Sequence, residues 1–285
     1  MIGSLLAIFS ATCFGALGIF ARLGYESGLS VSQMLAWRFA LTLLPLSLLR
    51  WLLHREDIGL KGLGIAVLMG AIGYAGQALL YFSSVQRIGA SLTAILLYLY
   101  PSFVTLWVWI FDHKTPRGSQ WFSLFLAFLG TTLASSTSKF QLDPLGIGLG
   151  IGAGLTYSVY LMVSSRILKS HDPWSVSIFV CLGATLSFLT LNKFQHVPLF
   201  LENSEQRLII LGLTFISTIL PMITIFSAIP RIGITHVSIL STIEPIVTLI
   251  LGALILHENL SNLQVLGALS ILTSVVLLQL GPMTK

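Results

Sequence analysis

The chain has 285 residues, of which 55% are apolar and only 9% are charged, and its mean hydropathy is +0.92. Soluble domains carry about a quarter charged residues, so this composition excludes an ordinary soluble fold. The formal net charge of +5 does not indicate nucleic-acid binding, because lysine and arginine lie in short connecting segments rather than along one stripe. The composition predicts a polytopic membrane protein.

A membrane-spanning helix needs about 20 mostly apolar residues. Ten stretches meet this requirement: 3–21, 31–52, 62–84, 90–111, 119–137, 146–166, 174–191, 208–229, 234–256 and 262–280. We therefore expect an all-α membrane protein of ten transmembrane helices. The longest connection, residues 192–206, is too short for a soluble domain. The first stretch lacks a basic segment and a clear cleavage site, so we expect it to be a retained helix.

The distribution of lysine and arginine predicts the orientation. The side that holds both termini carries nine of them: Arg50, Arg55, Lys61, Lys114, Arg117, Arg166, Lys169, Arg231 and Lys285. The opposite side carries five: Arg22, Arg87, Lys139, Lys193 and Arg207. This bias places both termini in the cytoplasm and the protein in a cytoplasmic membrane, which we expect to be a bacterial inner membrane.

The chain repeats itself at a constant offset of 144 positions. Residues 82–101 match residues 226–245, with identical Arg-Ile-Gly triplets at 87–89 and 231–233 and matching prolines at their ends. Equivalent positions are separated by five helices. Because five is odd, the halves 1–139 and 140–285 must be inverted relative to each other. Inverted repeats around a midplane binding site are typical of secondary transporters.

The repeat-related prolines, Pro101 and Pro245, both fall near the centre of their helices. Proline removes a backbone donor and frees a carbonyl, which in hydrocarbon needs a partner or a wet cavity. Polar and aromatic residues at helical spacing also predict faces that turn toward this cavity. The candidate cavity residues are Tyr74, Gln77, Tyr81, Tyr98, Pro101, Tyr157, Tyr160, Ser217, Pro221, Thr242, Glu244 and Pro245. Interhelical packing alone is the alternative for any single serine or threonine.

Two ionisable residues, Arg38 and Glu244, lie inside predicted spans at similar depth. Intramembrane charges are costly and commonly functional. One interpretation is a structural ion pair between them. The other places Glu244 on an aqueous cavity, where it binds a cationic group or a proton, and we favour this second interpretation because Pro245 should open the helix there.

The sequence lacks the motifs of ATP hydrolysis by a P-loop and of zinc-dependent catalysis. There is no P-loop, and His257-Glu258 is not part of an H-E-x-x-H zinc site. We expect no catalytic residue, no metal and no cofactor. Cys13 and Cys181 lie within apolar runs, so we expect buried thiols rather than a disulfide. Glycines alternate from Gly146 to Gly154, a GxxxG spacing that predicts close helix packing.

Three stretches resemble the EamA-type transporters of the drug/metabolite transporter superfamily. The first stretch, residues 13–46, carries a Phe-Gly pair and the embedded Arg38, and the second stretch is residues 154–177. Residues 228–278 carry Glu244-Pro245, His257-Glu258 and a glycine in the last helix. The resemblance spans nearly the whole chain.

The resemblance implies an inverted-repeat fold in which helices 1, 3, 4, 6, 8 and 9 surround a cavity and helices 5 and 10 lie outside it. It also implies export or exchange of small organic metabolites, often amino acids. Whether this transport is coupled to a proton or to a counter-solute stays open. One departure is Lys114, which stands where the second half has Glu258 and family members commonly have an acid.

The expected function is therefore a secondary or facilitative transporter of a small organic solute, working by alternating access as a monomer or weak homodimer in the lipid bilayer. An importer or exchanger of a charged metabolite, such as a nucleoside-like cofactor, is the first alternative. An intramembrane enzyme and a non-transporting scaffold are more remote alternatives.

Overall fold

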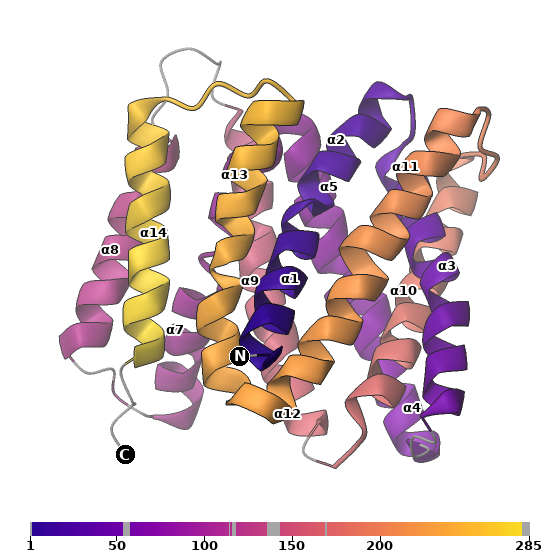
Figure 1. Cartoon of the computed structure of the whole chain (residues 1–285), viewed down its shortest axis with the longest axis horizontal. Coiled ribbons are helices and arrows are strands. Elements are labelled where there is room, and N and C mark those ends of the chain that lie inside the picture. The colour runs from indigo at the N-terminus through magenta and orange to yellow at the C-terminus, as the bar shows by residue number, and fades with distance from the viewer. Residues whose placement is uncertain are drawn as a thin grey trace.

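A computed structural model describes residues 2–53, 58–113, 115, 118–135, 143–168 and 170–280. Every regular element in these ranges is a helix (Figure 1). In the first half they are α1 (Ile2–Gly15), α2 (Leu17–Glu26), α3 (Val31–Leu52), α4 (Gly59–Leu68), the π-helix η1 (Met69–Tyr74), α5 (Ala75–Ile88), α6 (Ala90–Leu97), α7 (Tyr100–Asp112) and α8 (Gly118–Ser135). In the second half they are α9 (Pro144–Ile167), α10 (Pro173–Gln195), α11 (Ser204–Thr214), the π-helix η2 (Phe215–Ile219), α12 (Leu220–Ser241), α13 (Ile243–Ile255) and α14 (Asn262–Leu280).

The helices are long and apolar enough for a multi-span membrane protein. Within the described residues, seven continuous stretches satisfy both criteria: Ile2–Glu26, Val31–Leu52, Gly59–Ile88, Ala90–Phe111, Pro144–Ile167, Pro173–Gln195 and Ser204–Ile229. Ile243–Ile255 and Asn262–Leu277 are shorter apolar helices. Leu44 and Phe128 are exposed by 78% and 73%, a favourable arrangement only against lipid.

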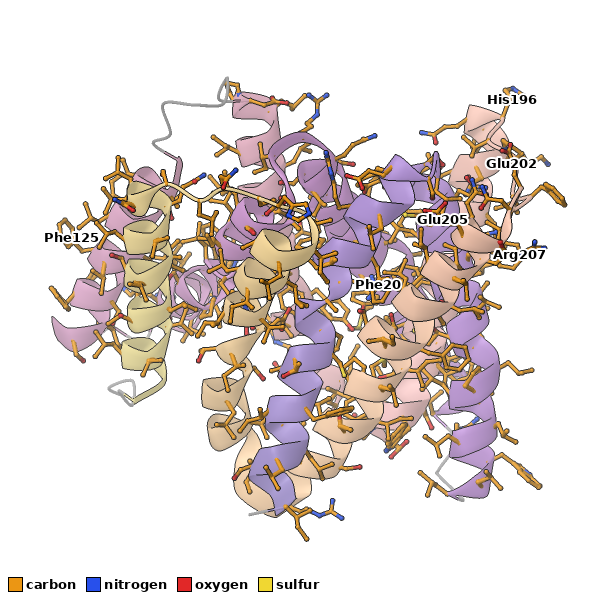
Figure 2. The ribbon with its side chains drawn as sticks, turned by 45° about the horizontal axis from the view of Figure 1, so that its top comes forward. Phe20, Phe125, His196, Glu202, Glu205 and Arg207 are labelled. Atoms are coloured by element: carbon orange, nitrogen blue, oxygen red, sulfur yellow. The ribbon has the colours of Figure 1, made fainter. Side chains whose placement is uncertain are left out.

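Figure 2 shows the same division between apolar flank and polar end. Phe125 points outward from α8, whereas His196, Glu202, Glu205 and Arg207 gather where α10 connects to α11. Charged side chains thus lie at an end of the bundle, where headgroups and water can solvate them.

The two halves make matching contacts at their first helices. A Cβ added to Gly3 on α1 would lie 2.6 Å from Cγ2 of Ile232, and one added to Gly146 on α9 would lie 2.5 Å from Cγ2 of Ile88. Ile88 and Ile232 are the central residues of the two Arg-Ile-Gly triplets. Each first helix therefore packs against the triplet of the opposite half, and only glycine leaves room for this approach.

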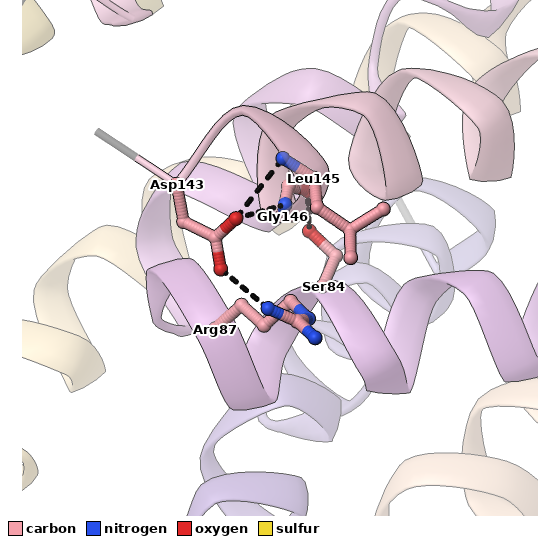
Figure 3. Close-up of polar contacts among 5 residues, drawn as sticks. All are labelled: Ser84, Arg87, Asp143, Leu145 and Gly146. Carbon is pink, nitrogen blue, oxygen red and sulfur yellow. Dashed lines mark hydrogen bonds and ion pairs between the residues drawn. The ribbon is translucent and has the colours of Figure 1, made fainter. Parts of the chain in front are cut away.

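Polar contacts reinforce one of these junctions (Figure 3). Asp143 accepts hydrogen bonds from the Leu145 and Gly146 amides and so caps α9, while Arg87 donates to its other oxygen at 2.7 Å. The hydrogen bond from Arg87 holds the pKa of Asp143 below its ordinary value. Ser84 donates to the Gly146 carbonyl at 2.9 Å. Among the alternating glycines of α9, the expected close packing is confirmed at Gly146, whereas nothing lies within 4 Å of a Cβ added at Gly148.

Two pairs of equivalent helices flank the bundle. At one flank α8 packs on α14, where a Cβ on Gly130 would lie 2.7 Å from the Gly267 carbonyl oxygen and one on Gly267 would lie 2.5 Å from that of Gly130. At the other flank α3 packs on α10, where Asn192 donates to the Ser32 carbonyl at 2.9 Å. Figure 1 shows these pairs at opposite sides of the molecule.

The structure departs from the expected spans in two respects. First, π-helical turns interrupt the third and eighth stretches at corresponding places, η1 and η2. Second, α12 runs through residues 229–234, where the sequence predicts a break between spans. The break at the first triplet depends on Gly89, whose φ is +84°, whereas the backbone at Gly233 stays helical. Figure 1 shows α12 bending there toward α13. The predicted boundary at 139/140 lies outside the described residues.

Gly183 of α10 packs closely on α4, and this contact predicts the effect of a substitution on stability. A Cβ at Gly183 would lie 2.0 Å from the backbone oxygen of Val67, which cannot move aside. Gly183→Ala should therefore destabilise the protein by about 1–3 kcal/mol. Thermal unfolding in detergent should show a midpoint lower by roughly 3 °C or more.

Gly148→Ala is the matched control, because nothing lies within 4 Å of a Cβ at that position. It removes a helical glycine and should be neutral or stabilising by up to about 1 kcal/mol. Equal midpoints for the two variants would contradict the close contact at Gly183.

Candidate functional site

A cavity of about 1020 Å³ lies between the two halves of the chain. Its wall includes Arg38, Tyr81 and Tyr98 from the first half and Tyr157 and Glu244 from the second. None of the described residues of α8 and α14 lines it. The cavity therefore lies where the resemblance implies, among the inner helices and away from the α8–α14 pair.

Seven of the sequence-predicted cavity residues lie on the wall: Tyr74, Gln77, Tyr81, Tyr98, Pro101, Tyr157 and Glu244. The embedded Arg38 joins them. These residues come from six helical elements (α3, η1, α5, α7, α9 and α13) and from the turn between α6 and α7, so the fold brings together side chains that helical spacing could only assign to individual faces.

Five predicted residues do not line the wall: Tyr160, Ser217, Pro221, Thr242 and Pro245. Tyr160 lies behind it, stacked on Tyr74 with ring centroids 5.4 Å apart. Ser217 is fully buried within η2, and the carbonyl of Pro221 accepts a hydrogen bond from Ser10 at 2.9 Å. The π-helical turn explains the shift on this helix, because an extra residue in one turn rotates the following side chains away from the face that regular α spacing predicts.

Six aromatic rings form a continuous chain of contacts beside the cavity, which we call the aromatic belt. Its members are Phe39, Tyr74, Tyr160, Tyr157, Tyr100 and Tyr98, in order of contact. Neighbouring ring centroids are between 4.9 and 6.1 Å apart. These are the separations at which stacked and edge-to-face rings attract each other, so the belt is a supported surface.

Tyr100 is a belt member that the sequence analysis missed. It lies on the cavity wall and contacts Tyr157 at 4.9 Å between ring centroids. Tyr100 is the repeat counterpart of Glu244, at the offset of 144 positions. Because Glu244 is predicted to line the cavity, the repeat also predicts a cavity position for Tyr100.

The helices are interrupted at the two prolines, where the sequence predicts only a bend. α6 ends at Leu97 and α7 begins at Tyr100-Pro101, while α12 ends at Ser241 and α13 begins at Ile243. Pro245 has no N–H to donate to the carbonyl four residues back, that of Ser241. The Tyr98 hydroxyl donates to this freed carbonyl at 2.6 Å, and it also lies 3.0 Å from Oε2 of Glu244.

Arg38 is held from a different side of the cavity. Its Nε donates to Thr218 Oγ1 at 2.8 Å, and Thr218 donates in turn to the Leu213 carbonyl at 3.0 Å, five residues back across η2. The guanidinium carbon lies 5.1 Å from the Phe39 ring centroid and 5.9 Å from that of Phe82. Among the described residues, no ion pair joins Arg38 to Glu244.

One end of the cavity is sealed by a contact within the first half and by contacts between the halves. The Tyr25 hydroxyl donates to the Phe82 carbonyl at 2.7 Å. Glu258, from the turn after α13, accepts from the backbone N–H groups of Ala90 and Ser91 at 2.8 and 3.1 Å. The carboxylate thus caps α6 across the repeat interface, in a space that exists because Gly89 has no Cβ.

The opposite end is lined differently. The wall continues past Val108 on α7 to Ser165, Arg166 and Leu168 at the end of α9. This is the end of the bundle that holds the beginning of α1 (Figure 1). The repeat counterpart of Glu258 on this side is Lys114, which lies outside the described residues. A lysine has no acceptor and cannot cap a helix as Glu258 does.

Comparison with known proteins gives a consistent picture. The model of the EamA-like transporter family matches residues 1–136 and again residues 144–280. The uncharacterized transporter YcbK of Bacillus subtilis (strain 168) is 24% identical over 277 residues, covering 93% of this chain and 88% of the relative. The threonine/homoserine exporter RhtA of Escherichia coli (strain K12) is 24% identical over 211 residues, covering 71% of this chain and 67% of the relative.

An uncharacterized transporter of Archaeoglobus fulgidus is likewise 24% identical, over 96% of this chain and 95% of its own. A solved structure described only as "Crystal structure of protein" superposes with a TM-score of 0.68 at 14% identity, covering 96% of this chain and 95% of the other. That likeness concerns the fold alone. The two family matches together span nearly the whole sequence, and the chain belongs to the EamA-like transporter family, whose members in the drug/metabolite transporter superfamily are integral membrane transporters.

Proposed function

We propose that this protein is a secondary or facilitative transporter that exports a small organic metabolite, an amino acid or a related compound, by alternating access. The observation that carries the proposal is the cavity between the matched halves, sealed at one end and lined as far as the last turn of α9 at the other. A site enclosed between two inverted repeats is the arrangement that alternating access requires. The name of RhtA, a threonine/homoserine exporter, supports amino acids as the substrate class.

The proposed topology has ten spans, two inverted halves of five and both termini in the cytoplasm of a bacterial inner membrane. The excess of lysine and arginine on the terminal side supports this orientation. In this orientation the end near Arg166 faces the cytoplasm and the Glu258 turn faces outward. The cavity is then presented to the compartment from which an exporter loads its solute.

The topology predicts the accessibility of single cysteines in a chain whose buried Cys13 and Cys181 are replaced by alanine. A cysteine at exposed Ser204 should react with an impermeant thiol reagent in intact cells. One at exposed Gly118 should react only after permeabilisation. The reverse pattern would overturn the proposed orientation.

The outward seal predicts an effect of Glu258→Ala. Loss of the acceptor for two backbone N–H groups should favour opening, and a bias of about 1.4 kcal/mol changes the open population tenfold. A reporter cysteine at Leu97, on the cavity wall, should then react about ten times faster from outside.

Glu202→Ala provides the control, because Glu202 is an exposed acid at the same end of the bundle. It should leave the reporter's reaction rate unchanged. A Glu258→Ala protein that folds normally and protects Leu97→Cys as well as the parent does would show that Glu258 does not seal the cavity.

The cavity predicts that flux depends on Tyr157. In proteoliposomes, exchange of radiolabelled L-threonine and L-homoserine should fall at least about tenfold in Tyr157→Ala, because the variant removes belt surface from the wall. Phe128→Ala removes an aromatic ring that is 73% exposed on α8 and should retain parental flux. Equal losses of flux in both variants would contradict a role for the belt. A comparison of flux with and without an imposed proton gradient decides whether transport is coupled to protons.

A further inference from the structure

Two opposite charges face one cavity without neutralising each other. Arg38 and Glu244 both line the wall, yet within the described part of the chain neither takes part in an ion pair. From this geometry we propose that the cavity binds zwitterionic solutes, with the solute's carboxylate at Arg38 and its ammonium group at Glu244. The inference rests on the proposed transport function and adds the charge pattern of the substrate and a residue for each pole.

Arg38 has the properties of a carboxylate site. The residue is only 3% exposed, so its charge is largely removed from water. Its contacts are neutral, namely the hydroxyls of Thr218 and Tyr74 and the faces of Phe39 and Phe82. A buried cation without an anion is strongly unfavourable, and a guanidinium is well shaped to hold a carboxylate through two parallel hydrogen bonds.

Thr218 also fixes the direction of that binding. The hydrogen bond from Nε to Thr218 Oγ1 occupies the inner edge of the guanidinium, and the Leu213 carbonyl anchors Thr218 in turn. Rotation of the guanidinium would break this chain of hydrogen bonds. The remaining donors of Arg38 belong to a group whose position is set before any ligand enters, which lowers the entropic cost of binding.

Glu244 is the complementary pole. Its neighbour Tyr98 has a single hydroxyl proton, and the Ser241 carbonyl at 2.6 Å is closer to that hydroxyl than Oε2 of Glu244 at 3.0 Å. The tyrosine therefore gives the carboxylate at best a shared hydrogen bond. An ammonium group from a solute supplies the charge and the donors that the protein does not, and the tyrosine rings nearby add cation–π attraction.

The aromatic belt keeps the two poles from collapsing onto each other. It runs from Phe39, beneath Arg38, to Tyr98, beside Glu244, through four intervening tyrosine rings. Packing holds these rings in place, so a solute that carries both charges is needed to neutralise both residues together. A solute with a single charge leaves one buried charge unpaired, and sites of that kind reject incomplete ligands strongly.

The test uses ligands that differ only in the two charged groups. One series is L-phenylalanine, phenethylamine and 3-phenylpropionate, and the other is L-threonine, 1-amino-2-propanol and 3-hydroxybutyrate. Purified protein bearing the Leu97→Cys reporter, without Cys13 and Cys181, is reacted with a thiol reagent in the presence of each ligand. In at least one series the amino acid should slow the reaction at a concentration at least about tenfold lower than the amine or the acid, a difference of about 1.4 kcal/mol.

Charge-removing variants assign the poles. Arg38→Gln should abolish the preference for the amino acid over the amine, and Glu244→Gln should abolish its preference over the acid. Arg38→Lys and Glu244→Asp should retain part of each preference. Arg207→Gln, which removes an exposed guanidinium on α11 that does not line the cavity, should behave as the parent does.

The possible results distinguish a failure of this inference from a failure of the proposed transport function. Protection by the amine or the acid equal to that by the amino acid, or no protection by either amino acid, overturns the zwitterion site. Amino-acid protection without flux in proteoliposomes leaves the binding site in place and overturns the transport function. A preference that both glutamine variants leave unchanged overturns the assignment of the poles.

Discussion

The missing N–H group of Pro245 shapes the centre of this molecule. Without that donor the Ser241 carbonyl has no partner within its own helix, and the Tyr98 hydroxyl from the opposite half supplies one at 2.6 Å. This hydrogen bond brings the break between α6 and α7 against the break between α12 and α13. It also places Tyr98 beside Glu244 while directing its proton elsewhere. Helix termination, contact between the halves and the polarity of the cavity thus follow from one absent backbone donor.

A second irregularity in the backbone has a comparable role for Arg38. In η2 the Thr218 hydroxyl reaches the Leu213 carbonyl five residues back, and the same oxygen accepts from Nε of Arg38. The π-helical turn therefore provides an anchor that a regular α-helix would not place in the same position. Arg38 and Glu244 are consequently both positioned by departures from regular helical geometry.

Much of the fold follows from the sequence because membrane-spanning helices must satisfy their own backbone groups and present apolar side chains to lipid. The apolar stretches fix where helices occur, and period-3.6 spacing placed Tyr74, Gln77 and Tyr157 on the wall. Proline chemistry marked the positions of the two interruptions but predicted bends rather than separate helices. The π-helical turns left no comparable signal, and they rotate Ser217 and Pro221 off the expected face. Tyr160 missed the wall because whether a ring lines a cavity or supports it depends on its partner, here Tyr74, from a distant segment.

The flanking pairs α8–α14 and α3–α10 share a geometric property. Each pair joins an element to its own counterpart in the sequence repeat, so under the proposed inverted repeat the twofold axis passes between its members. If the two halves exchange conformations, a contact across that axis maps onto itself. At the offset of 144 positions, Gly130 and Gly267 correspond to Ser274 and Ser123 on the same two helices, so it is the pair α8–α14 as a whole, and not the glycine contact itself, that maps onto itself. In the alternating-access cycle proposed above, these two pairs would form the edges of the bundle that stay in place while the cavity opens to either side.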